Sequence, residues 1–206
     1  MKPEHIESSS FDIIDNEAGD HAFSPRQWEI VRRMIHTTAD FDYMNMIHFH
    51  PRAIDAGIDA IRRGRPIFTD THMAEVGIRN IESTHFHVAV TCLITDPAVV
   101  QAAARNGTTR AQAAVDAAAP DMEGGIYVIG NAPTALLRLI DLVAAGRARP
   151  ALIIGLPVGF VNAAESKAKL TAMDYPCISN TGRKGGSTVA ACVVNALLKM
   201  AASQSA

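Results

Sequence analysis

Several features that would assign this chain to a familiar class of protein are missing from it. Its 206 residues carry 19 basic and 21 acidic side chains, so no large excess of charge favours nucleic acid or an anionic membrane as a partner. No apolar run approaches the ~18 residues that a membrane-spanning helix needs. The first 20 residues are polar and acidic, unlike a signal peptide. These absences predict a soluble, cytoplasmic protein that binds neither nucleic acid nor membrane.

The sequence also lacks the common cysteine and nucleotide-binding motifs. Cys92, Cys177 and Cys192 lie far apart, each in an apolar run, and no C-x-x-C pair occurs. Buried thiols in a reducing compartment are therefore expected, rather than disulfides or a zinc site. The phosphate-binding patterns G-x-x-x-x-G-K-[ST] and G-x-G-x-x-G are absent, as is the G-x-S-x-G elbow of serine hydrolases. Nucleotide binding and serine hydrolysis have little support.

Hydrophobic patterning predicts a single α/β domain over residues 24–206, after a partly ordered lead-in over residues 1–23 that Phe11, Ile13 and Ile14 could anchor. Strands are predicted at residues 66–69, 87–94, 126–129, 151–156 and 176–179. Helices are predicted at residues 25–36, 51–63, 71–77, 97–105, 108–119, 134–145, 163–172 and 187–201. Apolar strands that alternate with helices indicate a three-layer sandwich around a mostly parallel five-stranded sheet with right-handed crossovers.

Two of the predicted helices have little polar surface. They are the alanine-rich helix at residues 111–119 and the last helix, at residues 187–201. A helix that is apolar nearly all round must be buried, either in the core or against another subunit. A homodimer is therefore a reasonable expectation.

The loops that follow the strands are the candidate binding site, because open parallel sheets bind ligands at the carboxyl ends of their strands. Loops at residues 130–134, 156–162 and 180–187 each lead into a predicted helix. Glycine allows a close approach to a ligand, and the N–H groups at a helix start attract anions. Arg183 can hold a carboxylate through two hydrogen bonds, and Lys184 adds a point charge. We expect the last loop to bind anions, although a tight turn with solvated cations is the alternative.

His36 is the candidate catalytic group. Ser24 and Pro25 predict the start of a helix that ends near His36, and apolar residues recur at helical spacing from Trp28 to Ile35. The packed stripe would hold the imidazole rigidly. Histidine titrates near neutral pH, which suits proton transfer. The alternative is an imidazole that only interacts with the carbonyl groups at a helix C-terminus.

Three other charged side chains stay open between a functional and a structural role. Arg110 lies just inside a predicted helix start, where a cation opposes the helix dipole unless an anion is near, so binding and solvation are equally plausible. Glu165 and Lys167 could form a general acid and base pair. A solvated face at a helix start is the favoured interpretation of that pair.

The remaining histidines come partly in pairs. His48 with His50, and His85 with His87, have the two-residue spacing that places both imidazoles on one face of a strand. No cysteine or carboxylate pattern accompanies them, so no metal site is predicted. His72 could line the same cleft as His36, but ordinary hydrogen bonding is favoured.

Several separated motifs resemble one known family. They read IHTTADFD at residues 35–42, DPAVV at 96–100, TTR at 108–110, GNAPTAL at 130–136, PVGFVNAAESK at 157–167 and GRKGGS at 182–187. Together they resemble the precorrin-8X methylmutase family of cobalamin biosynthesis, over residues 24–198. Residues 37–40 and 182–184 look more like its cobalt-precorrin-8 branch. Residues 44–51 and 79–87 follow no pattern assignable to the family.

The resemblance implies an isomerase that moves a methyl group from carbon eleven to carbon twelve of the ring, converting precorrin-8X to hydrogenobyrinic acid or cobalt-precorrin-8 to cobyrinic acid. It implies a flavodoxin-like fold, no cofactor, no protein-bound metal, and a homodimer with active sites near the subunit interface. His36 would protonate or hydrogen-bond the macrocycle. A non-catalytic carrier of the tetrapyrrole product is the alternative, and a nucleotide-binding transferase is disfavoured. The expected substrate-binding residues are Thr37, Thr38, Asp70, Thr71, Arg110, Asn131, Ala132, Pro133, Thr134, Pro157, Gly159, Phe160, Gly182, Arg183, Lys184, Gly185, Gly186 and Ser187.

Overall fold

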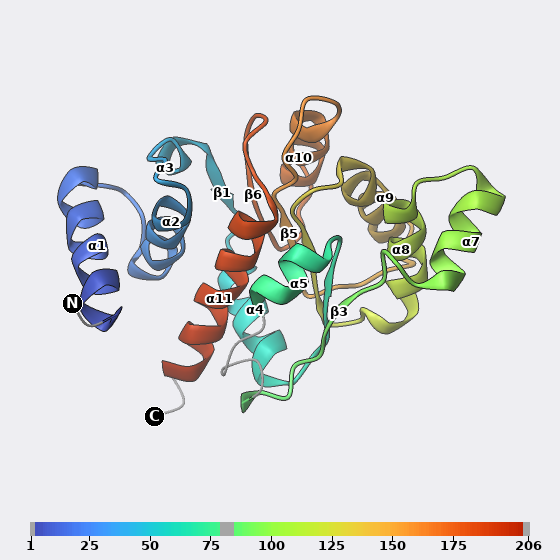
Figure 1. Ribbon diagram of the computed structural model, residues 1–206, viewed down its shortest axis with the longest axis horizontal. Helices are drawn as coiled ribbons and strands as arrows, with labels where there is room; N and C mark the ends of the chain where they lie inside the picture. The colour runs from blue at the N-terminus through green and yellow to red at the C-terminus, as the bar shows by residue number, and fades with distance from the viewer. Residues whose placement is uncertain (1–2, 79–84, 204–206) are drawn as a thin grey trace.

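The computed structural model describes residues 3–78 and 85–203, which form one sheet with helices on both of its faces (Figure 1). The strands are β1 (Ile47–Phe49), β2 (Ile67–Thr69), β3 (Val90–Cys92), β4 (Ile126–Ile129), β5 (Leu152–Gly155) and β6 (Cys177–Asn180). They pair in the order β1-β6-β5-β4-β2-β3, and every pair except β1 with β6 is parallel. The five parallel strands have the flavodoxin-like order, so the expected fold is confirmed.

The sheet has a sixth strand that the sequence did not predict. β1 runs antiparallel to β6 at the sheet edge and pairs Ile47 with Asn180 and Phe49 with Ile178. Three half-buried residues are too few to produce a recognisable alternation. β3 is shorter than the predicted strand at residues 87–94, and His87 adopts a positive φ of 53° before it begins. The expected placement of His85 and His87 on one strand face is therefore wrong.

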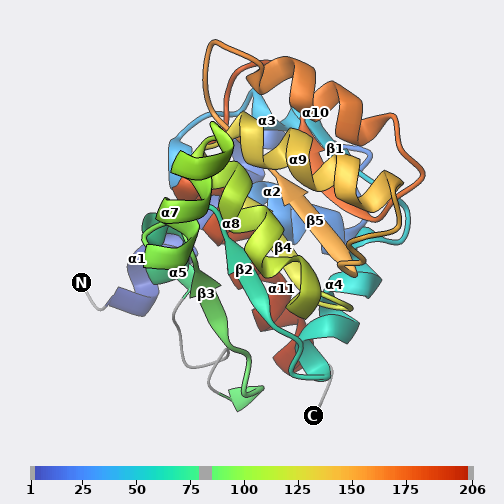
Figure 2. The same ribbon diagram turned by 90° about the vertical axis from the view of Figure 1, so that its right-hand side faces the viewer.

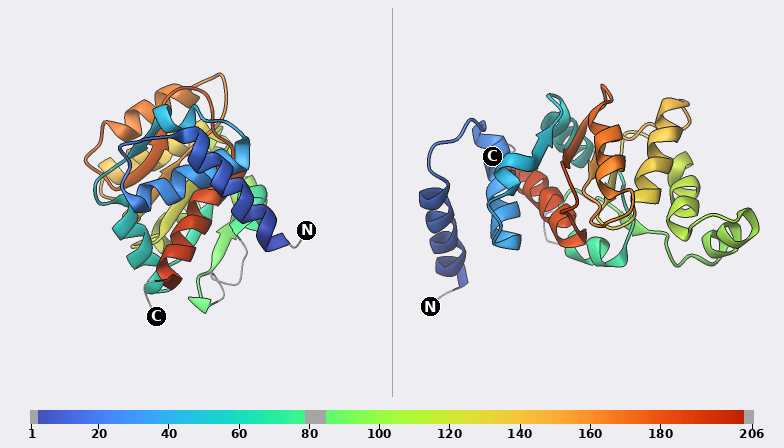
Figure 3. Two further views of the ribbon diagram at one scale, coloured as in Figure 1. Left: turned by 90° about the vertical axis from the view of Figure 1, so that its left-hand side faces the viewer. Right: turned by 90° about the horizontal axis from the view of Figure 1, so that it is seen from above.

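Helices cover both faces of the sheet (Figure 2). One face carries α8 (Arg110–Ala118), α9 (Pro133–Ala144) and α10 (Ala163–Thr171), with the 3-10 turn η1 (Ala119–Asp121) after α8. The other carries α4 (Ala53–Arg62), α5 (His72–Ile78) and α11 (Ser187–Ser203), with α2 (Pro25–Thr38) packed on α11 and the short α3 (Tyr43–Met46) after α2. α7 (Pro97–Asn106) lies outside α8 and α1 (Pro3–Ala18) outside α2, at opposite ends of the molecule (Figure 3).

The strands read as continuous apolar runs because both of their faces are buried. In β4, Ile126 and Val128 pack into the core under α4 and α11, whereas Tyr127 and Ile129 pack into the core under α8 and α9. Successive side chains of a strand point to opposite faces, so a strand between two helical layers has no polar face.

The two apolar helices that suggested a homodimer are covered within the single chain. α11 lies against α2, α4 and α5, and α8 lies between α7 and α9. Their apolar surfaces therefore give no reason for a second subunit. Within residues 3–78 and 85–203, no helix is long and apolar enough to cross a membrane.

The segment expected to be a partly ordered lead-in is mostly the helix α1. Phe11 and Ile14 anchor it on Val31 and Ile35 of α2, as expected, whereas Ile13 is 57% exposed. An Asp15 carboxylate adds two polar contacts to α2, through the indole N–H of Trp28 at 2.9 Å and the guanidinium of Arg32 at 2.9 Å. α1 is thus fixed to the body by both apolar and polar contacts.

Candidate active site

His36 lies on the last turn of a helix whose two ends are well defined. Ser24 and Gln27 form a reciprocal capping box at the start of α2, with Pro25 in its first turn, as predicted. The helix runs two residues beyond His36 and closes at Ala39, which adopts a left-handed φ of 52°. The His36 side chain is exposed, while Met34 and Ile35 beside it are buried. The packing fixes the end of the helix, as expected, and the imidazole projects from it at the surface.

A cavity of about 400 Å³ opens beside His36, between α1 and the end of α2. Its walls are Ser10, Ile13, Ile14 and Glu17 of α1 with Ile35, His36, Ala39 and Phe41. Sequence reasoning placed none of the four α1 residues in the site, because no motif marks them, although it named Ile13 and Ile14 as possible anchors of the segment. The apolar cluster that includes Phe11 was the one signal that this segment packs on the body.

The loop after β6 reaches the segment that follows His36. Lys184 Nζ lies 2.5 Å from Asp40 Oδ2 and 2.7 Å from Asp42 Oδ2. The hydrogen bond from Lys184 holds the pKa of Asp40 below its usual value, and the two carboxylates raise the pKa of Lys184. Lys184 was expected to bind a carboxylate of a ligand, but here it binds two carboxylates of the chain itself. These contacts also join the motif at residues 182–187 to the motif at residues 35–42, which is distant in sequence.

The loops after β5 and β6 are locked together by their main chains. The N–H of Gly159 donates to the carbonyl oxygen of Arg183 at 3.2 Å, and the N–H of Gly186 donates to that of Leu156 at 3.0 Å. At Gly185, a Cβ atom would lie 2.2 Å from the Leu156 oxygen, so only glycine fits there. Two of the predicted glycine-rich turns therefore form one unit.

Asp70 occupies the crevice between β2 and β4, where the strand order reverses. Its side chain is 2% exposed and accepts three N–H groups, from Gly130 at 3.0 Å, Asn131 at 2.8 Å and Ala132 at 2.7 Å. Burial raises the pKa of Asp70, and the three N–H donors oppose that rise by stabilising the carboxylate. The main-chain groups expected to attract a ligand anion are thus occupied by this carboxylate.

Hydroxyl pairs connect the helix starts around that crevice. Thr71 Oγ1 lies 2.8 Å from Ser187 Oγ, and Thr109 Oγ1 lies 3.2 Å from Thr134 Oγ1. Thr109 also caps α8, so Arg110 follows directly after this link to the start of α9. The predicted residues of the β2, β4 and β6 loops therefore form one continuous edge, with the exposed Arg110 at its rim.

Several predicted contact residues lie at the surface of this edge. Phe160 is 85% exposed, and the Arg183 guanidinium lies 5.5 Å from the centroid of its ring. Gly182 is exposed, whereas Pro157 is buried and Pro133 begins α9. An exposed aromatic ring beside a cation is suited to a flat ligand that carries carboxylates.

The two threonines after His36 are used locally. Thr37 Oγ1 donates to the carbonyl oxygen of Arg33, and Thr38 Oγ1 donates to that of Met34, each at 2.8 Å. Their hydroxyl protons therefore satisfy the helix, and their oxygen lone pairs are the groups left to face a ligand.

Lys167 differs most from its sequence-based interpretation. A solvated helix face was favoured, yet Lys167 is 0% exposed, while its supposed partner Glu165 is exposed. Its Nζ donates to Asn180 Oδ1 at 3.1 Å and to the carbonyl oxygen of Lys184 at 2.6 Å. Burial lowers the pKa of Lys167 to about 8. The burial of Lys167 could not be predicted from the sequence, because a lysine near a helix start is usually at the surface.

His72 and His50 have ordinary polar partners. His72 hydrogen-bonds Glu75 and Thr95, each at 2.8 Å, as favoured from the sequence. His50 lies 2.9 Å from Asp174 Oδ1, and burial lowers the pKa of His48. In the part of the chain that is described, no three histidine, cysteine or carboxylate side chains gather as a metal site would require. Most of the second segment that departs from the family pattern, residues 79–84, lies outside the described residues.

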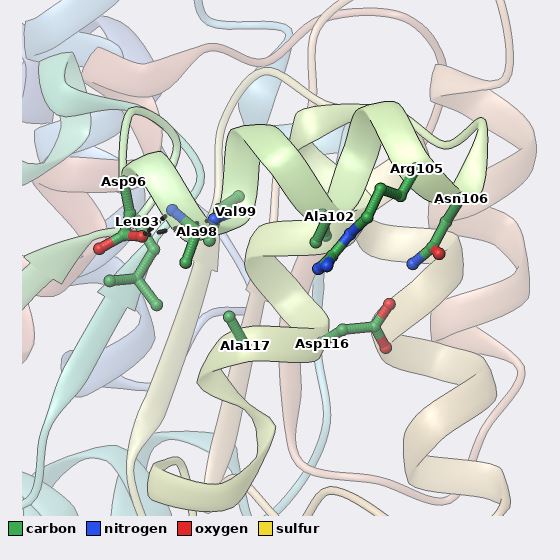
Figure 4. A pocket seen from close by; sticks show the side chains of 10 residues that line it. Leu93, Asp96, Ala98, Val99, Ala102, Arg105, Asn106, Asp116 and Ala117 are labelled. Carbon is green, nitrogen blue, oxygen red and sulfur yellow. Dashed lines mark hydrogen bonds between the residues drawn. The ribbon is translucent and has the colours of Figure 1, made fainter.

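A second cavity, of about 440 Å³, lies between α7 and α8 (Figure 4). Figure 4 shows Arg105 extending from α7 into the space above α8, whose Asp116 lies below. The acidic groups in this cavity have structural roles, because Asp96 caps α7 and Asp116 pairs with Arg138 at 2.7 Å. Among the described residues, no histidine lines this cavity, so the cavity at His36 is the better candidate for the active site.

Comparison with known proteins supports one family. Residues 5–200 match the family described as precorrin-8X methylmutase. The cobalt-precorrin-8 methylmutases of Priestia megaterium and Salmonella typhimurium are 46% and 45% identical to this chain, each over 96% of it, and over 88% and 95% of their own lengths. A crystal structure of precorrin-8X methylmutase from Thermus thermophilus matches with a TM-score of 0.91 at 44% identity, covering 98% of this chain and 97% of that one. This chain belongs to the precorrin-8X methylmutase family.

Proposed function

We propose that this protein catalyses the intramolecular methyl migration of cobalamin biosynthesis on cobalt-precorrin-8, with His36 as the proton donor or hydrogen-bond partner of the macrocycle. Membership of the family makes the protein an isomerase of the methylmutase type. The observation that carries the role of His36 is its position on a firmly capped helix, beside an apolar cavity and one short segment away from the cation of the β6 loop.

The chain supplies the two kinds of contact that a broad, carboxylate-fringed ring needs. Apolar groups such as Ile14 and Phe41 line the cavity at His36, while Arg183 and Lys184 project from the loop after β6. Arginine and lysine hold carboxylates at the periphery, and this fixes the ring relative to the imidazole. A rigidly oriented ring lowers the barrier because an intramolecular shift depends on position more than on added reagents.

The metal of the substrate is a finer part of the proposal. The two relatives described above are named cobalt-precorrin-8 methylmutases, and this favours a cobalt-containing substrate for this chain. Cobalt would then arrive inside the ring, with no ion held by the protein and no cofactor consumed.

We also propose a cytoplasmic homodimer. Free thiols at Cys92, Cys177 and Cys192 suit a reducing compartment. Met73 and Val76 of α5 are 65% and 62% exposed, which gives an apolar surface that a second subunit could cover. Light scattering at micromolar concentration tests the dimer, because a single 22 kDa species would reject it.

The test of the catalytic role is His36→Ala, with His21→Ala as a matched control at a histidine that packs against Trp28 instead. We expect His36→Ala to lower kcat by about a hundredfold or more, as loss of a general acid does, while the Kd for the corrinoid stays within about threefold. An undiminished rate contradicts the role of His36. The carrier alternative is tested with wild-type protein, because only an enzyme converts a molar excess of substrate, as followed by its absorption spectrum.

A further inference from the structure

Lys167 is a fully buried cationic side chain that the proposed mechanism does not use. It lies on α10, under the loop after β6, with its Nζ between Asn180 Oδ1 and the carbonyl oxygen of Lys184. Burying an amine costs free energy, and an apolar residue of similar size is often at least as stabilising. A role beyond stability is therefore the better explanation for a lysine at this position.

We infer that Lys167 is a positioning residue that fixes the loop after β6 so that Arg183 and Lys184 face the substrate. The inference deepens the proposed function, on which its catalytic consequence rests. Lys167 itself does not reach the surface, so it acts through the loop and touches no ligand.

The contacts pin the loop at one peptide group. The carbonyl oxygen of Lys184 accepts both the amine of Lys167 at 2.6 Å and the side-chain N–H of Asn180 at 2.9 Å. The next residue, Gly185, is held tightly against the Leu156 carbonyl. The main chain at residues 184–185 is thus anchored inward, and this anchoring leaves the side chains of Arg183 and Lys184 outside.

Asn180 makes the arrangement specific for an amine. Its Oδ1 accepts from Lys167, and its Nδ2 donates to the carbonyl oxygens of Thr181 and Lys184. The two acceptors around Lys167 each receive an N–H of its amine, and both protonation states can supply them, because a neutral amine has two N–H groups and an ammonium group has three. Burial lowers the pKa of Lys167 to about 8, so the side chain is mainly charged at neutral pH.

From this anchor the effect extends to the candidate catalytic helix. The ammonium group of Lys184, the residue whose carbonyl group is anchored, bridges Asp40 and Asp42 just after α2. A displaced loop would therefore move the cations and also release the segment that follows His36.

The test compares Lys167→Met with Lys169→Met, which removes an exposed lysine of the same helix whose Nζ pairs with Asp141 at 2.8 Å. Two backbone N–H groups report on the loop, because Thr181 donates to Met46 and Gly186 donates to Leu156. In Lys167→Met we expect both amides to exchange hydrogen at least about tenfold faster, and KM for the corrinoid to rise about tenfold with a smaller change in kcat. Lys169→Met should change neither measurement. The milder variant Lys167→Gln keeps an N–H donor, although one of shorter reach. It should therefore raise the amide exchange rates and KM by a smaller factor than Lys167→Met does.

Each result is decisive for one part of the inference. Wild-type exchange at Thr181 and Gly186 in Lys167→Met and Lys167→Gln would overturn the positioning role. Faster exchange with an unchanged KM would leave the anchor in place but overturn the substrate-binding role of the loop, which belongs to the proposed function. Faster exchange with a raised KM, restored partly in Lys167→Gln, supports both.

Discussion

The ring of Phe11 lies 5.2 Å from the imidazole of His36, centroid to centroid, with 56° between their planes. The guanidinium of Arg32 lies 4.4 Å from the centroid of the same Phe11 ring. α1 therefore contacts the candidate catalytic side chain directly, while α2 carries it. A segment without any recognised motif therefore lines the candidate site.

Phe11→Ala should lower kcat/KM by about tenfold, because the imidazole loses its aromatic neighbour and α1 loses an anchor. Removing a buried phenylalanine costs on the order of 3 kcal/mol of packing. Phe23→Ala is the control, since Phe23 belongs to the same cluster but stacks on Trp28. The measurement is kcat/KM of both variants by steady-state kinetics. An equal loss of kcat/KM in the two variants would contradict a specific role of Phe11.

Asp70→Ala should destabilise the fold by about 3 kcal/mol, because three buried N–H groups lose a charged acceptor. Asp96→Ala, which removes an exposed helix cap at α7, should cost only about 1 kcal/mol. Urea unfolding of the two variants provides the comparison. Equal and small losses would mean that water replaces the Asp70 carboxylate without penalty.

Lys184→Met should raise KM for the corrinoid by about tenfold, because one cation at the rim is lost. Its ion pairs with Asp40 and Asp42 are exposed, so the free energy of unfolding should change by less than about 1 kcal/mol. Asp42→Asn, which keeps the lysine and removes one competing carboxylate, should leave KM unchanged or lower it. A raised KM in Asp42→Asn would show that the pair itself is what the substrate requires.

The stability contributed by Lys167 should depend on pH in the alkaline range. Its pKa in the folded state is about 8, lowered by burial from 10.5. Between these values the unfolded chain binds more protons, so the free energy of unfolding rises with pH. Relative to Lys167→Met, wild-type protein should gain about 2 kcal/mol between pH 7.5 and pH 10. A pH-independent difference in urea unfolding would mean that Lys167 titrates normally.

Most of the fold could be predicted because its strands are apolar on both faces and its helices are marked by caps such as Ser24 and Asp96. Prediction failed where the local pattern was short or ambiguous. β1 has three residues and depends on pairing with β6, and α1 is an acidic helix whose apolar residues occupy few positions. Both elements are defined by tertiary contacts that a local pattern does not contain.

The sequence predicted which loops lie together better than it predicted the hydrogen bonds that those loops make. The loops at the carboxyl ends of the strands do lie together, with His36 close to the loop that carries Lys184. The sequence could not indicate that Asp70 would fill its own crevice or that Lys167 would be buried. Residue type and spacing identify which groups are available, but not which of them satisfy one another.

The occupied crevice has a consequence for what this architecture can hold. Flavodoxin-like proteins commonly bind a phosphate-containing ligand where their strand order reverses. Here the carboxylate of Asp70 already accepts the main-chain N–H groups at that position. A compact anionic cofactor would therefore meet a carboxylate at the centre instead of free N–H groups. Under the proposed function, Arg110, Phe160 and Arg183 at the perimeter bind a wide, flat ligand through the carboxylates around its edge.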